Sequence, residues 1–509
     1  MEGPTRPSRA GSEEFDHSVS RRRALRLAGM TVAAGAGAYA ADTALTPAIA
    51  EAQSSNVYVI VNQSGGGDYT NLEQAIQSVA PNTTILVKSG LYTIQSGNMR
   101  PATGVRIIGE GYGTHVQAVN GMNASLFILE YDNIVLENLR IDGNGANQNL
   151  ASGNGVYIDG VQRCRVVGCW VHDSAGYNIV LFPGSKHCAV LGNHVYSALQ
   201  MGIELQGASY CSVVGNTVNG SGETGIFLWN SSGDCGYNAV AGNTVHACED
   251  GIHIEDNAHD NAISGNTAIS NSRYGIAASG VGSNTLVGNV SRLNGSDGIH
   301  VESSSNFVVA DNLVDDNGRM GIYIRTAPGC AVTGNVVKNS KWNGIEISSG
   351  SSSPIAGSVC SGNVCVGNGN GAVGGQQAGI HIRQAEVGIP LNGNLCYDGG
   401  SNTQLYGIAV TDSSASEVLL QGNALSGNVQ SGLSIASGNA IATTPDRILQ
   451  GISVGPNQTA VRHGLPYVPV TVSICMTSPG TVWRSAPSDA TNVYVTADAP
   501  KRTADIAVG

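Results

Sequence analysis

A short pattern of apolar and variable positions, Gly-Ile-X-Ile, recurs through the middle of the chain. Apolar residues alternate with variable ones in each copy, which is the period of a strand with one buried face. The first seven copies begin at Gly202, Gly225, Gly251, Gly275, Gly298, Gly321 and Gly344. Their isoleucines follow one another at intervals of 23, 26, 24, 23, 23 and 23 residues. A fixed period in this range predicts a solenoid of stacked coils.

A second pattern, Gly-Asn, follows about 13 residues after the first in most repeats. Early copies are Gly192-Asn193, Gly215-Asn216, Gly242-Asn243, Gly265-Asn266 and Gly288-Asn289. Gly-Asn tolerates positive φ and marks a turn between strands, and stacked asparagines can hydrogen-bond from coil to coil. Strand, turn and strand leave no room for a helix in each repeat. The pattern therefore predicts a parallel β-helix, whose coils lie about 4.8 Å apart.

Both patterns resemble the repeats of the pectin-lyase-like right-handed parallel β-helix superfamily, over residues 55–445. The resemblance implies an all-β solenoid of roughly a dozen coils. The resemblance says little about the reaction, because the superfamily includes lyases, epimerases, hydrolases, fructotransferases, phage tailspikes and adhesins.

The two ends of the solenoid carry their own signals. Thr70, followed by Glu73 and apolar residues at helical spacing, predicts a capping box and a short helix that covers the N-terminal coil. Residues 452–509 show short strands separated by turns and predict a small C-terminal β-domain. With the run from Arg462 to Pro466, this part looks like domains that assemble trimers in phage tail proteins. The resemblance implies a homotrimer, and a monomeric end cap is the alternative.

Residues 1–50 are predicted to be a targeting segment. The run Ser20-Arg21-Arg22-Arg23-Ala24-Leu25-Arg26 resembles a twin-arginine signal, although Ala24 stands where the family usually has phenylalanine. An apolar stretch from Leu27 to Ala41 and a plausible cleavage site at Ala48-Ile49-Ala50 follow. The protein is therefore expected to be secreted, exported in its folded form through the twin-arginine pathway.

The amino-acid composition limits the kinds of binding partner and the redox state that we expect. The chain has 69 glycines and 12% charged residues, against about 25% in an ordinary domain, as turn-rich repeats require. The net charge of −12 argues against nucleic acid and anionic membranes as partners. Of the eleven cysteines, Cys188, Cys211 and Cys330 each precede a turn asparagine by five residues, a slot that stacks inside the coils. We expect buried, reduced thiols, with a disulfide between Cys360 and Cys365 as the alternative.

The residue after each Gly-Ile, and the residue two positions further on, form two outward columns predicted to face solvent. The first column runs through Tyr157, Val180, Glu204, Phe227, His253, Ala277, His300, Tyr323, Glu346, His381 and Ala409. The second runs through Asp159, Phe182, Gln206, Trp229, Glu255, Ser279, Glu302, Arg325, Ser348, Arg383 and Thr411. An inert solenoid would carry serine, threonine, asparagine and lysine here. Aromatic, histidine, acidic and arginine residues instead gather between residues 204 and 383.

The phrase His253-Ile254-Glu255 returns two coils later as His300-Val301-Glu302, with small Ala277 and Ser279 between them. Two coils separate the backbones by about 9.6 Å, and carboxyl groups about 6.5–9.5 Å apart suit an inverting glycosidase. Glu255 and Glu302 are therefore predicted to be acid and base, tuned by the two histidines. Asp250 and Asp256 are alternative carboxylates. A solvated ladder in which each histidine caps its glutamate is the structural alternative.

Aromatic residues on the same face predict a platform for sugar rings. Phe227 and Trp229 share one coil, and Phe182 lies two coils earlier. Cross-strand aromatic packing is the alternative. The other residues predicted to bind substrate are Glu204, Glu346, His381 and Arg383.

A second mechanism uses His300, Tyr323 and Arg325, which could remove and return a proton beside a uronate carboxyl group. This logic resembles that of alginate epimerases and lyases, but their Asp-Pro-His motif is absent. The acidic face would repel a polyuronate unless calcium intervened, so calcium is expected only for a lyase. The leading hypothesis is an exported enzyme that cleaves or transfers glycosyl units of a polysaccharide, without metal or cofactor. A non-catalytic glycan-binding protein is the third hypothesis.

Overall fold

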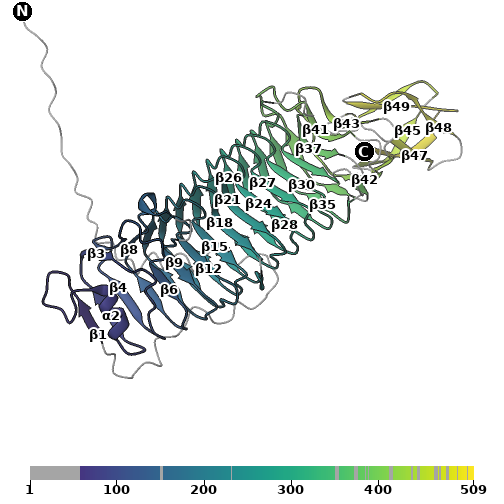
Figure 1. The fold of residues 1–509 in the computed structure, drawn as a ribbon. Coiled ribbons are helices and arrows are strands. Elements are labelled where there is room, and N and C mark those ends of the chain that lie inside the picture. The colour runs from purple at the N-terminus through teal and green to yellow at the C-terminus, as the bar shows by residue number, and fades with distance from the viewer. Residues whose placement is uncertain are drawn as a thin grey trace, which may run out of the picture. The chain divides into compact units, whose positions relative to one another are not determined.

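The computed structural model describes residues 58–508 apart from short gaps (Figure 1). The gaps are residues 150–152, 231, 350–354, 372–376, 384–385, 388, 412–415, 437–439, 444–446, 455, 463–467, 469–471, 477–480, 490 and 501. The predicted export signal at residues 1–50, and most of the run from Arg462 to Pro466, lie outside the described residues.

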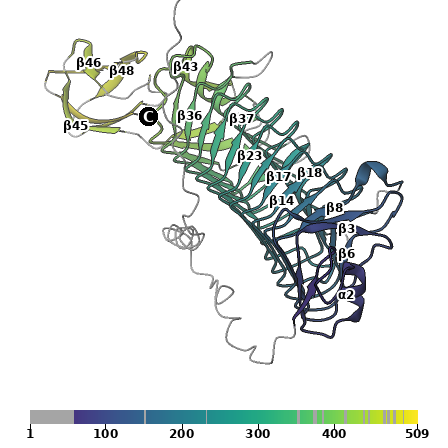
Figure 2. The same cartoon turned by 90° about the vertical axis from the view of Figure 1, so that its left-hand side faces the viewer.

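Residues from Tyr58 to Thr443 form a solenoid of three parallel sheets with 18, 13 and 13 strands, here called sheets A, B and C (Figures 1 and 2). In a typical coil one short strand enters sheet A, the Gly-Asn turn follows, the next strand enters sheet B, and the Gly-Ile-X-Ile strand enters sheet C. The predicted all-β solenoid fold is confirmed.

The strands of sheet A are β1 (Tyr58–Val61), β2 (Thr84–Val87), β4 (Arg106–Gly109), β7 (Val135–Glu137), β10 (Arg165–Val167), β13 (Ala189–Leu191), β16 (Ser212–Val214), β19 (Ala239–Ala241), β22 (Ala262–Ser264), β25 (Thr285–Val287), β28 (Val308–Ala310), β31 (Ala331–Thr333), β34 (Ile355–Ala356), β35 (Val359–Ser361), β38 (Glu386–Val387), β39 (Pro390–Asn392), β42 (Ser416–Gln421) and β44 (Ala440–Thr443). Those of sheet B are β3 (Gly90–Ile94), β5 (Thr114–Ala118), β8 (Arg140–Asp142), β11 (Trp170–His172), β14 (His194–Tyr196), β17 (Thr217–Asn219), β20 (Thr244–His246), β23 (Thr267–Ile269), β26 (Val290–Arg292), β29 (Leu313–Asp315), β32 (Val336–Lys338), β36 (Val364–Val366) and β40 (Leu395–Tyr397). Those of sheet C are β6 (Phe127–Leu129), β9 (Val156–Ile158), β12 (Ile179–Leu181), β15 (Ile203–Gln206), β18 (Thr224–Trp229), β21 (Asp250–Glu255), β24 (Ile276–Ser279), β27 (Ile299–Glu302), β30 (Ile322–Arg325), β33 (Ile345–Ser348), β37 (Ala378–Arg383), β41 (Tyr406–Val410) and β43 (Ser431–Ile435).

Inward isoleucine, valine and leucine side chains fill the interior, and a ladder of buried asparagines closes the turn between sheets A and B. The backbone N–H and Nδ2 of Asn266 donate to Oδ1 of Asn289 at 2.9 and 3.0 Å, and Nδ2 of Asn289 donates to the carbonyl of Ile263 at 2.9 Å. This confirms the predicted coil-to-coil hydrogen bonding. A further ladder through Asn271, Asn294 and Asn317 at the turn between sheets B and C was not predicted.

The N-terminal helix α2 (Leu72–Ser78) buries three side chains against the first coils of the solenoid. Its N-cap is Asn71, whose Oδ1 accepts from the N–H of Gln74 at 2.9 Å. The predicted capping box of Thr70 and Glu73 is therefore wrong. Glu73 instead accepts from the N–H groups of Gln95 and Ser96, because the neighbouring coil offers those donors at 3.1 Å.

Six strands at the C-terminal end pair antiparallel in two three-stranded sheets. They are β45 (Arg447–Val454), β46 (Thr459–Arg462), β47 (Val472–Met476), β48 (Val482–Ala486), β49 (Asn492–Ala497) and β50 (Arg502–Val508). Their small valine- and alanine-rich core is separate from that of the solenoid.

The ten cysteines between Cys164 and Cys396 are buried and free, which confirms the expected reduced thiols. Cys360 lies on β35 and Cys365 on β36, and they form no disulfide.

Candidate active site

The strand register of sheet C aligns the two outward columns as the repeat predicts. His253 pairs with Ala277, and Ala277 with His300; Glu255 pairs with Ser279, and Ser279 with Glu302. The two copies of the His-X-Glu phrase are therefore two coils apart on one face, separated by small side chains.

The first column does not face solvent as expected. Glu204 is 0% exposed, His300 3% and Glu346 1%. Neighbouring side chains cover these residues: the ring of Tyr274 stacks on His300 at 4.4 Å, and the indole N–H of Trp229 donates to Oε1 of Glu204. The second column is more open, and Glu255 and Glu302 are partly exposed.

Asp250 begins β21 and fixes the orientation of His253. Its buried carboxylate lies 3.0 Å from Nδ1 of His253. Arg273, from the next coil, donates to both carboxylate oxygens, and the N–H of Tyr274 adds a bond of 3.1 Å. Such a bidentate arginine–carboxylate pair holds both groups in a defined geometry. Nε2 of His253 is buried and has no hydrogen-bond partner among the described residues.

Asp297 repeats this arrangement for His300. Its carboxylate lies 2.7 Å from Nδ1 of His300 and accepts two hydrogen bonds from Arg319, at 2.8 and 2.9 Å. Here, however, Nε2 of His300 contacts Glu302 at 3.2 Å, and Glu302 is also paired with Arg325 at 2.7 Å. The predicted capping of glutamate by histidine thus occurs in this copy.

The two copies of the His-X-Glu phrase therefore differ in which side-chain atoms have hydrogen-bond partners. His300 and Glu302 have their polar atoms engaged, whereas the described part of the chain offers no hydrogen bond or ion pair to the side chain of Glu255. Sequence reasoning missed the roles of Asp297, Arg273 and Arg319. The repeated phrase Asp-Gly-Ile-His, with an arginine 22 or 23 residues after each aspartate, is the signal that could have revealed them.

Burial alone would raise the pKa of Asp250, but hydrogen bonds from Arg273 and His253 outweigh it and lower the pKa to about 2. A depressed carboxyl pKa contributes stability above its unfolded value, and that stability is lost as pH falls through the folded value. Replacing Asp250 by asparagine should therefore cost stability at pH 7, and the difference from wild type should shrink between pH 4 and about 2. Urea unfolding of both proteins across this range measures it; a difference that does not change with pH contradicts the ion pair.

Tyr323 lies edge-on to His300, with ring centroids 5.4 Å apart, and the guanidinium of Arg319 lies 5.2 Å from its ring. Burial raises the pKa of Tyr323, and the charge of Glu346 adds to this. The structure thus brings together His300, Tyr323 and Arg325, but Arg325 is already bound to Glu302.

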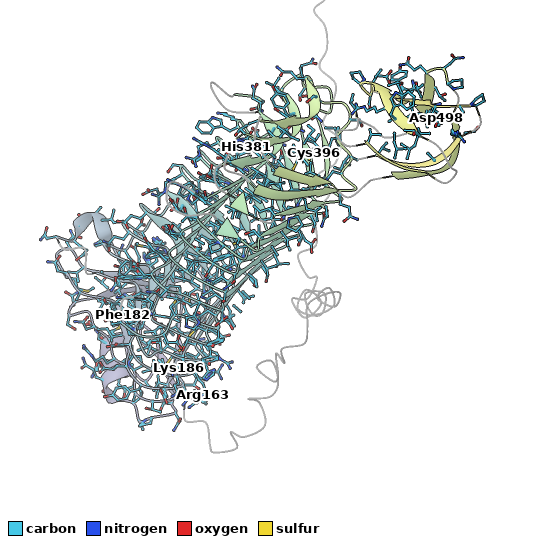
Figure 3. The ribbon with its side chains drawn as sticks, turned by 90° about the vertical axis from the view of Figure 1, so that its right-hand side faces the viewer. Arg163, Phe182, Lys186, His381, Cys396 and Asp498 are labelled. Atoms are coloured by element: carbon cyan, nitrogen blue, oxygen red, sulfur yellow. The ribbon has the colours of Figure 1, made fainter. Side chains whose placement is uncertain are left out.

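Further along the face, Glu346 and His381 form a third buried acid–histidine pair. Nδ1 of His381 lies 3.1 Å from Oε2 of Glu346, and its Nε2 lies 2.7 Å from the hydroxyl of Thr411. Oε1 of Glu346 has no hydrogen-bond partner among the described residues, although Arg383 approaches it at 3.8 Å. Figure 3 labels His381 near one end of this face and Phe182 near the other.

The predicted aromatic residues meet in two stacked pairs. Phe227 and Trp229 lie 5.9 Å apart at 17°, and Phe182 stacks on Tyr157 at 4.4 Å. Phe227 is 8% exposed, whereas Phe182 and Trp229 are partly exposed. Phe227 also lies edge-on to His253 on the next strand, with ring centroids 5.6 Å apart, and Trp229 and Phe182 are the more exposed of the three predicted aromatic residues.

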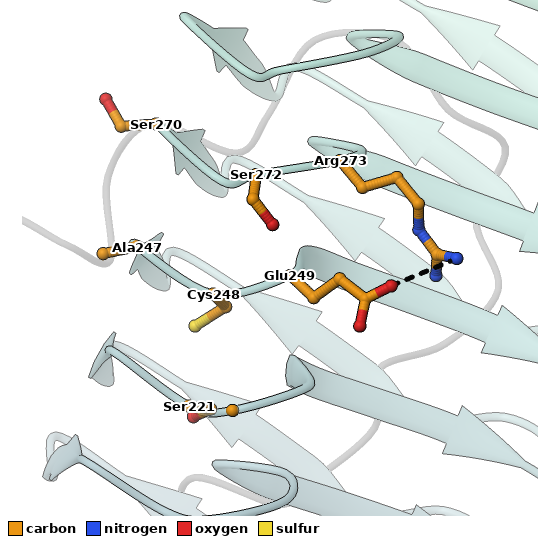
Figure 4. A pocket seen from close by; sticks show the side chains of 8 residues that line it. Ser221, Ala247, Cys248, Glu249, Ser270, Ser272 and Arg273 are labelled. Atoms are coloured by element: carbon orange, nitrogen blue, oxygen red, sulfur yellow. Dashed lines mark ion pairs between the residues drawn. The ribbon is translucent and has the colours of Figure 1, made fainter.

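A hollow of about 560 Å³ lies over the turns between sheets B and C, beside Arg273 (Figure 4). Small residues of three successive turns line it, together with the ion pair of Glu249 and Arg273 at 3.3 Å. It borders the coils that carry Asp250 and His253.

A second cluster lies on the outer side of sheet B, far along the chain from these residues. His115, Asp142 and His172 form the one group of three potential metal ligands found in the described ranges. Burial would raise the pKa of Asp142, but hydrogen bonds from His115 and the N–H of Asn144 lower it to about 2. Nε of Arg140 donates to Nε2 of His172 at 3.0 Å, so Nδ1 carries the proton and donates to Asp173 at 2.7 Å.

Two family profiles match the chain. The profile described as right handed beta helix region matches residues 232–396, and that described as periplasmic copper-binding protein (NosD) matches residues 51–272. The second range includes the His115 cluster, but its donors do not fit a copper ion. Arg140 and Asp173 engage both nitrogens of His172, and the guanidinium already supplies the positive charge.

No curated protein sequence matches the chain significantly. A tailspike protein of E. coli bacteriophage HK620, in complex with a pentasaccharide, is 14% identical with a TM-score of 0.57; the alignment covers 86% of this chain and 89% of that one. Gene product 12 of bacteriophage phi29 is 14% identical with a TM-score of 0.61, and 72% of this chain covers 54% of that chain. A mannuronan C-5 epimerase module of Azotobacter vinelandii is 15% identical with a TM-score of 0.44, covering 72% and 93%.

Within the described residues, each helix is too short or too polar to cross a membrane. At 14% identity the two bacteriophage structures establish the fold and leave the chemistry to the residues of this chain. The match to the right handed beta helix region, the three parallel sheets and these two structures identify the chain as a right-handed parallel β-helix protein.

Proposed function

We propose that the protein acts on a polysaccharide or oligosaccharide and cleaves or transfers its glycosyl units at the outer face of sheet C. The observation that carries this proposal is the pair of Glu255 and Glu302, in one column and two coils apart. That separation is about 9.6 Å between backbones, near the range of about 6.5–9.5 Å for the carboxyl groups of inverting glycosidases.

The surroundings of the two carboxyl groups favour different roles. Glu302 lies between Arg325 and His300, and an ion pair requires the charged form, which suits a base that activates water. Glu255 has no cationic partner among the described residues, which suits an acid that protonates the leaving oxygen. Ser279 is small and partly exposed, and it lies between the two glutamates in the column, where it would leave room for the water and the reacting sugar. Trp229, in the coil before Glu255, would hold a neighbouring sugar ring.

The tailspike of bacteriophage HK620 supports a glycan ligand, because a protein of this fold is described in complex with a pentasaccharide. Its similarity does not distinguish cleavage from binding.

A second candidate is proton abstraction, as in a lyase or epimerase. His300, Tyr323 and Arg325 are the predicted group for it, and the unpartnered Nε2 of His253 offers a base that Asp250 already orients. Nε2 of His300 is engaged by Glu302, so His253 is the better placed of the two histidines.

We also propose that the protein is exported and that it assembles as a homotrimer. The signal-like residues 1–50 support export through the twin-arginine pathway, and free buried thiols agree with folding before export. The resemblance of residues 452–509 to trimer-forming domains supports a homotrimer, which sedimentation of the purified protein tests.

The function is tested by incubating the purified protein with a panel of polysaccharides and identifying the products by mass spectrometry. Water-added or anhydro oligosaccharides without ultraviolet absorbance support glycosyl cleavage or transfer. Products that absorb in the ultraviolet, as unsaturated uronides do, favour proton abstraction. Binding without any product overturns the enzymatic proposal and leaves sheet C as a recognition surface.

A further inference from the structure

Glu204 differs from the other buried carboxylates of the described chain. Asp142, Asp250, Asp297 and Glu346 each contact an arginine or a histidine. Asp398 accepts instead from four backbone N–H groups, those of Gly400, Asn402, Thr403 and Gln404. Glu204 has neither kind of support. Its Oε1 accepts from the indole of Trp229, and its Oε2 has no partner among the described residues.

A carboxylate in this position is costly to keep charged. Burial and, to a smaller extent, the charge of Glu223 raise the pKa of Glu204 to about 7, although the hydrogen bond from Trp229 opposes them. The other titratable group that senses it, Tyr177, has its pKa raised to about 12 by burial and by Glu204 and Glu223. The titratable groups that interact with Glu204 are Glu223, which is negative when ionised, and Tyr177, which is neutral. Neither supplies the positive charge that would stabilise a buried carboxylate, so a bound cation would be the partner that Glu204 lacks.

The surroundings of Glu204 suit an organic cation. Phe227 pairs with Glu204 across the strands, and Trp229 stacks beside Phe227 at 5.9 Å. Aromatic faces carry partial negative charge and attract ammonium groups, most strongly where water is excluded. A metal ion would need further oxygen or nitrogen ligands, and Glu204 belongs to no group of three potential ligands in the part of the chain described.

We propose that Glu204, Phe227 and Trp229 bind the ammonium group of an amino sugar, so that the glycan recognised on sheet C carries free amino groups. This deepens the proposed function and rests on sheet C being the glycan-binding face. Glu204 lies two coils before His253 in the same column, so the amino sugar would lie to one side of the reacting bond. The net charge of −12 favours approach of such a glycan.

Trp229 covers Glu204 and is its hydrogen-bond donor, so binding at Glu204 must change the environment of the indole. Its fluorescence therefore reports occupancy, with Trp229→Phe as the variant that removes this signal.

Binding of three tetrasaccharides to the full-length protein by calorimetry tests the proposal: a glucosamine oligomer, its N-acetylated form and its N-trimethylated form. At pH 7 the two cationic forms should bind about tenfold or more tightly than the acetylated one. The trimethylated form keeps its charge at every pH. Its affinity should rise as pH increases through about 7, because Glu204 loses its proton there.

Glu204→Gln keeps the shape of the side chain and should remove both the preference and the pH dependence, whereas Glu137→Gln on sheet A should change neither. Equal affinities for the three wild-type complexes, no binding of any of them, or an unchanged preference in Glu204→Gln would each overturn the proposal. Circular dichroism shows whether the variant folds, and the wild-type comparison holds without it. Preferential binding of the cationic forms without cleavage of any glycan refutes the proposed enzymatic function and leaves this inference intact.

Discussion

Replacing Glu302 by glutamine should lower kcat on the glycan that the wild type cleaves by about 10²–10⁴-fold, the usual contribution of a general base. Glutamine keeps the size of the side chain but cannot accept a proton at neutral pH, and the pairing with Arg325 and His300 loses its charge. Glu255→Gln should cause a loss of the same order. The double variant should be little slower than the slower single one, because the two groups act in one step.

The two roles can be separated by the leaving group. A substrate with an activated aryl leaving group needs no protonation, so Glu255→Gln should recover most of its rate on that substrate and Glu302→Gln should not. Ser279→Ala is the matched control: Ser279 lies between the two glutamates in the same column, and its loss should leave kcat within a few-fold. Full activity of both glutamine variants would exclude this pair and move attention to His253.

The second large effect is on stability. Asn289→Leu should lower the free energy of unfolding by about 3–6 kcal/mol, because it removes four buried hydrogen bonds that the asparagine side chain makes. Its Oδ1 accepts from the N–H and Nδ2 of Asn266, and its Nδ2 donates to the carbonyl of Ile263 and to Oδ1 of Asn312. The N–H of Asn266 loses its partner, whereas Nδ2 of Asn266 keeps its bond to the carbonyl of Val240. Leucine keeps the branched shape of asparagine and leaves no cavity, so the loss reports hydrogen bonding more than cavity formation.

Amide hydrogen exchange measures the loss of stability coil by coil. This resolution suits a solenoid, because each coil contacts only its neighbours. The amides of the coils that contain Asn266 and Asn289 should exchange faster in the variant, and coils near β3 and β5 should change least. Thr244→Ala, on the outer side of sheet B, should alter unfolding by less than about 0.5 kcal/mol. A variant with wild-type exchange in its own coils would show that the ladder contributes little.

The sequence by itself determined the frame of this protein. The alternation in Gly-Ile-X-Ile specifies which side chains point inward, and the near-constant period aligns equivalent residues of successive coils. The columns through His253 and Glu255, and the ladder through Asn266, could therefore be predicted, and the register agrees. The burial of the cysteines could be predicted in the same way, because residues at equivalent positions of successive coils stack in the interior.

The tertiary structure alone decided the state of each site residue. Arg273 reaches Asp250 from the next coil, Trp229 covers Glu204, and Glu302 is engaged where Glu255 is open. These differences arise from side-chain directions and from contacts between coils, and the local pattern is the same in both copies of the phrase. The N-cap shifted to Asn71 for a similar reason, since a neighbouring coil offered Glu73 better donors. A repeat specifies which positions stack; the choice among possible partners at each position depends on geometry that the repeat does not encode.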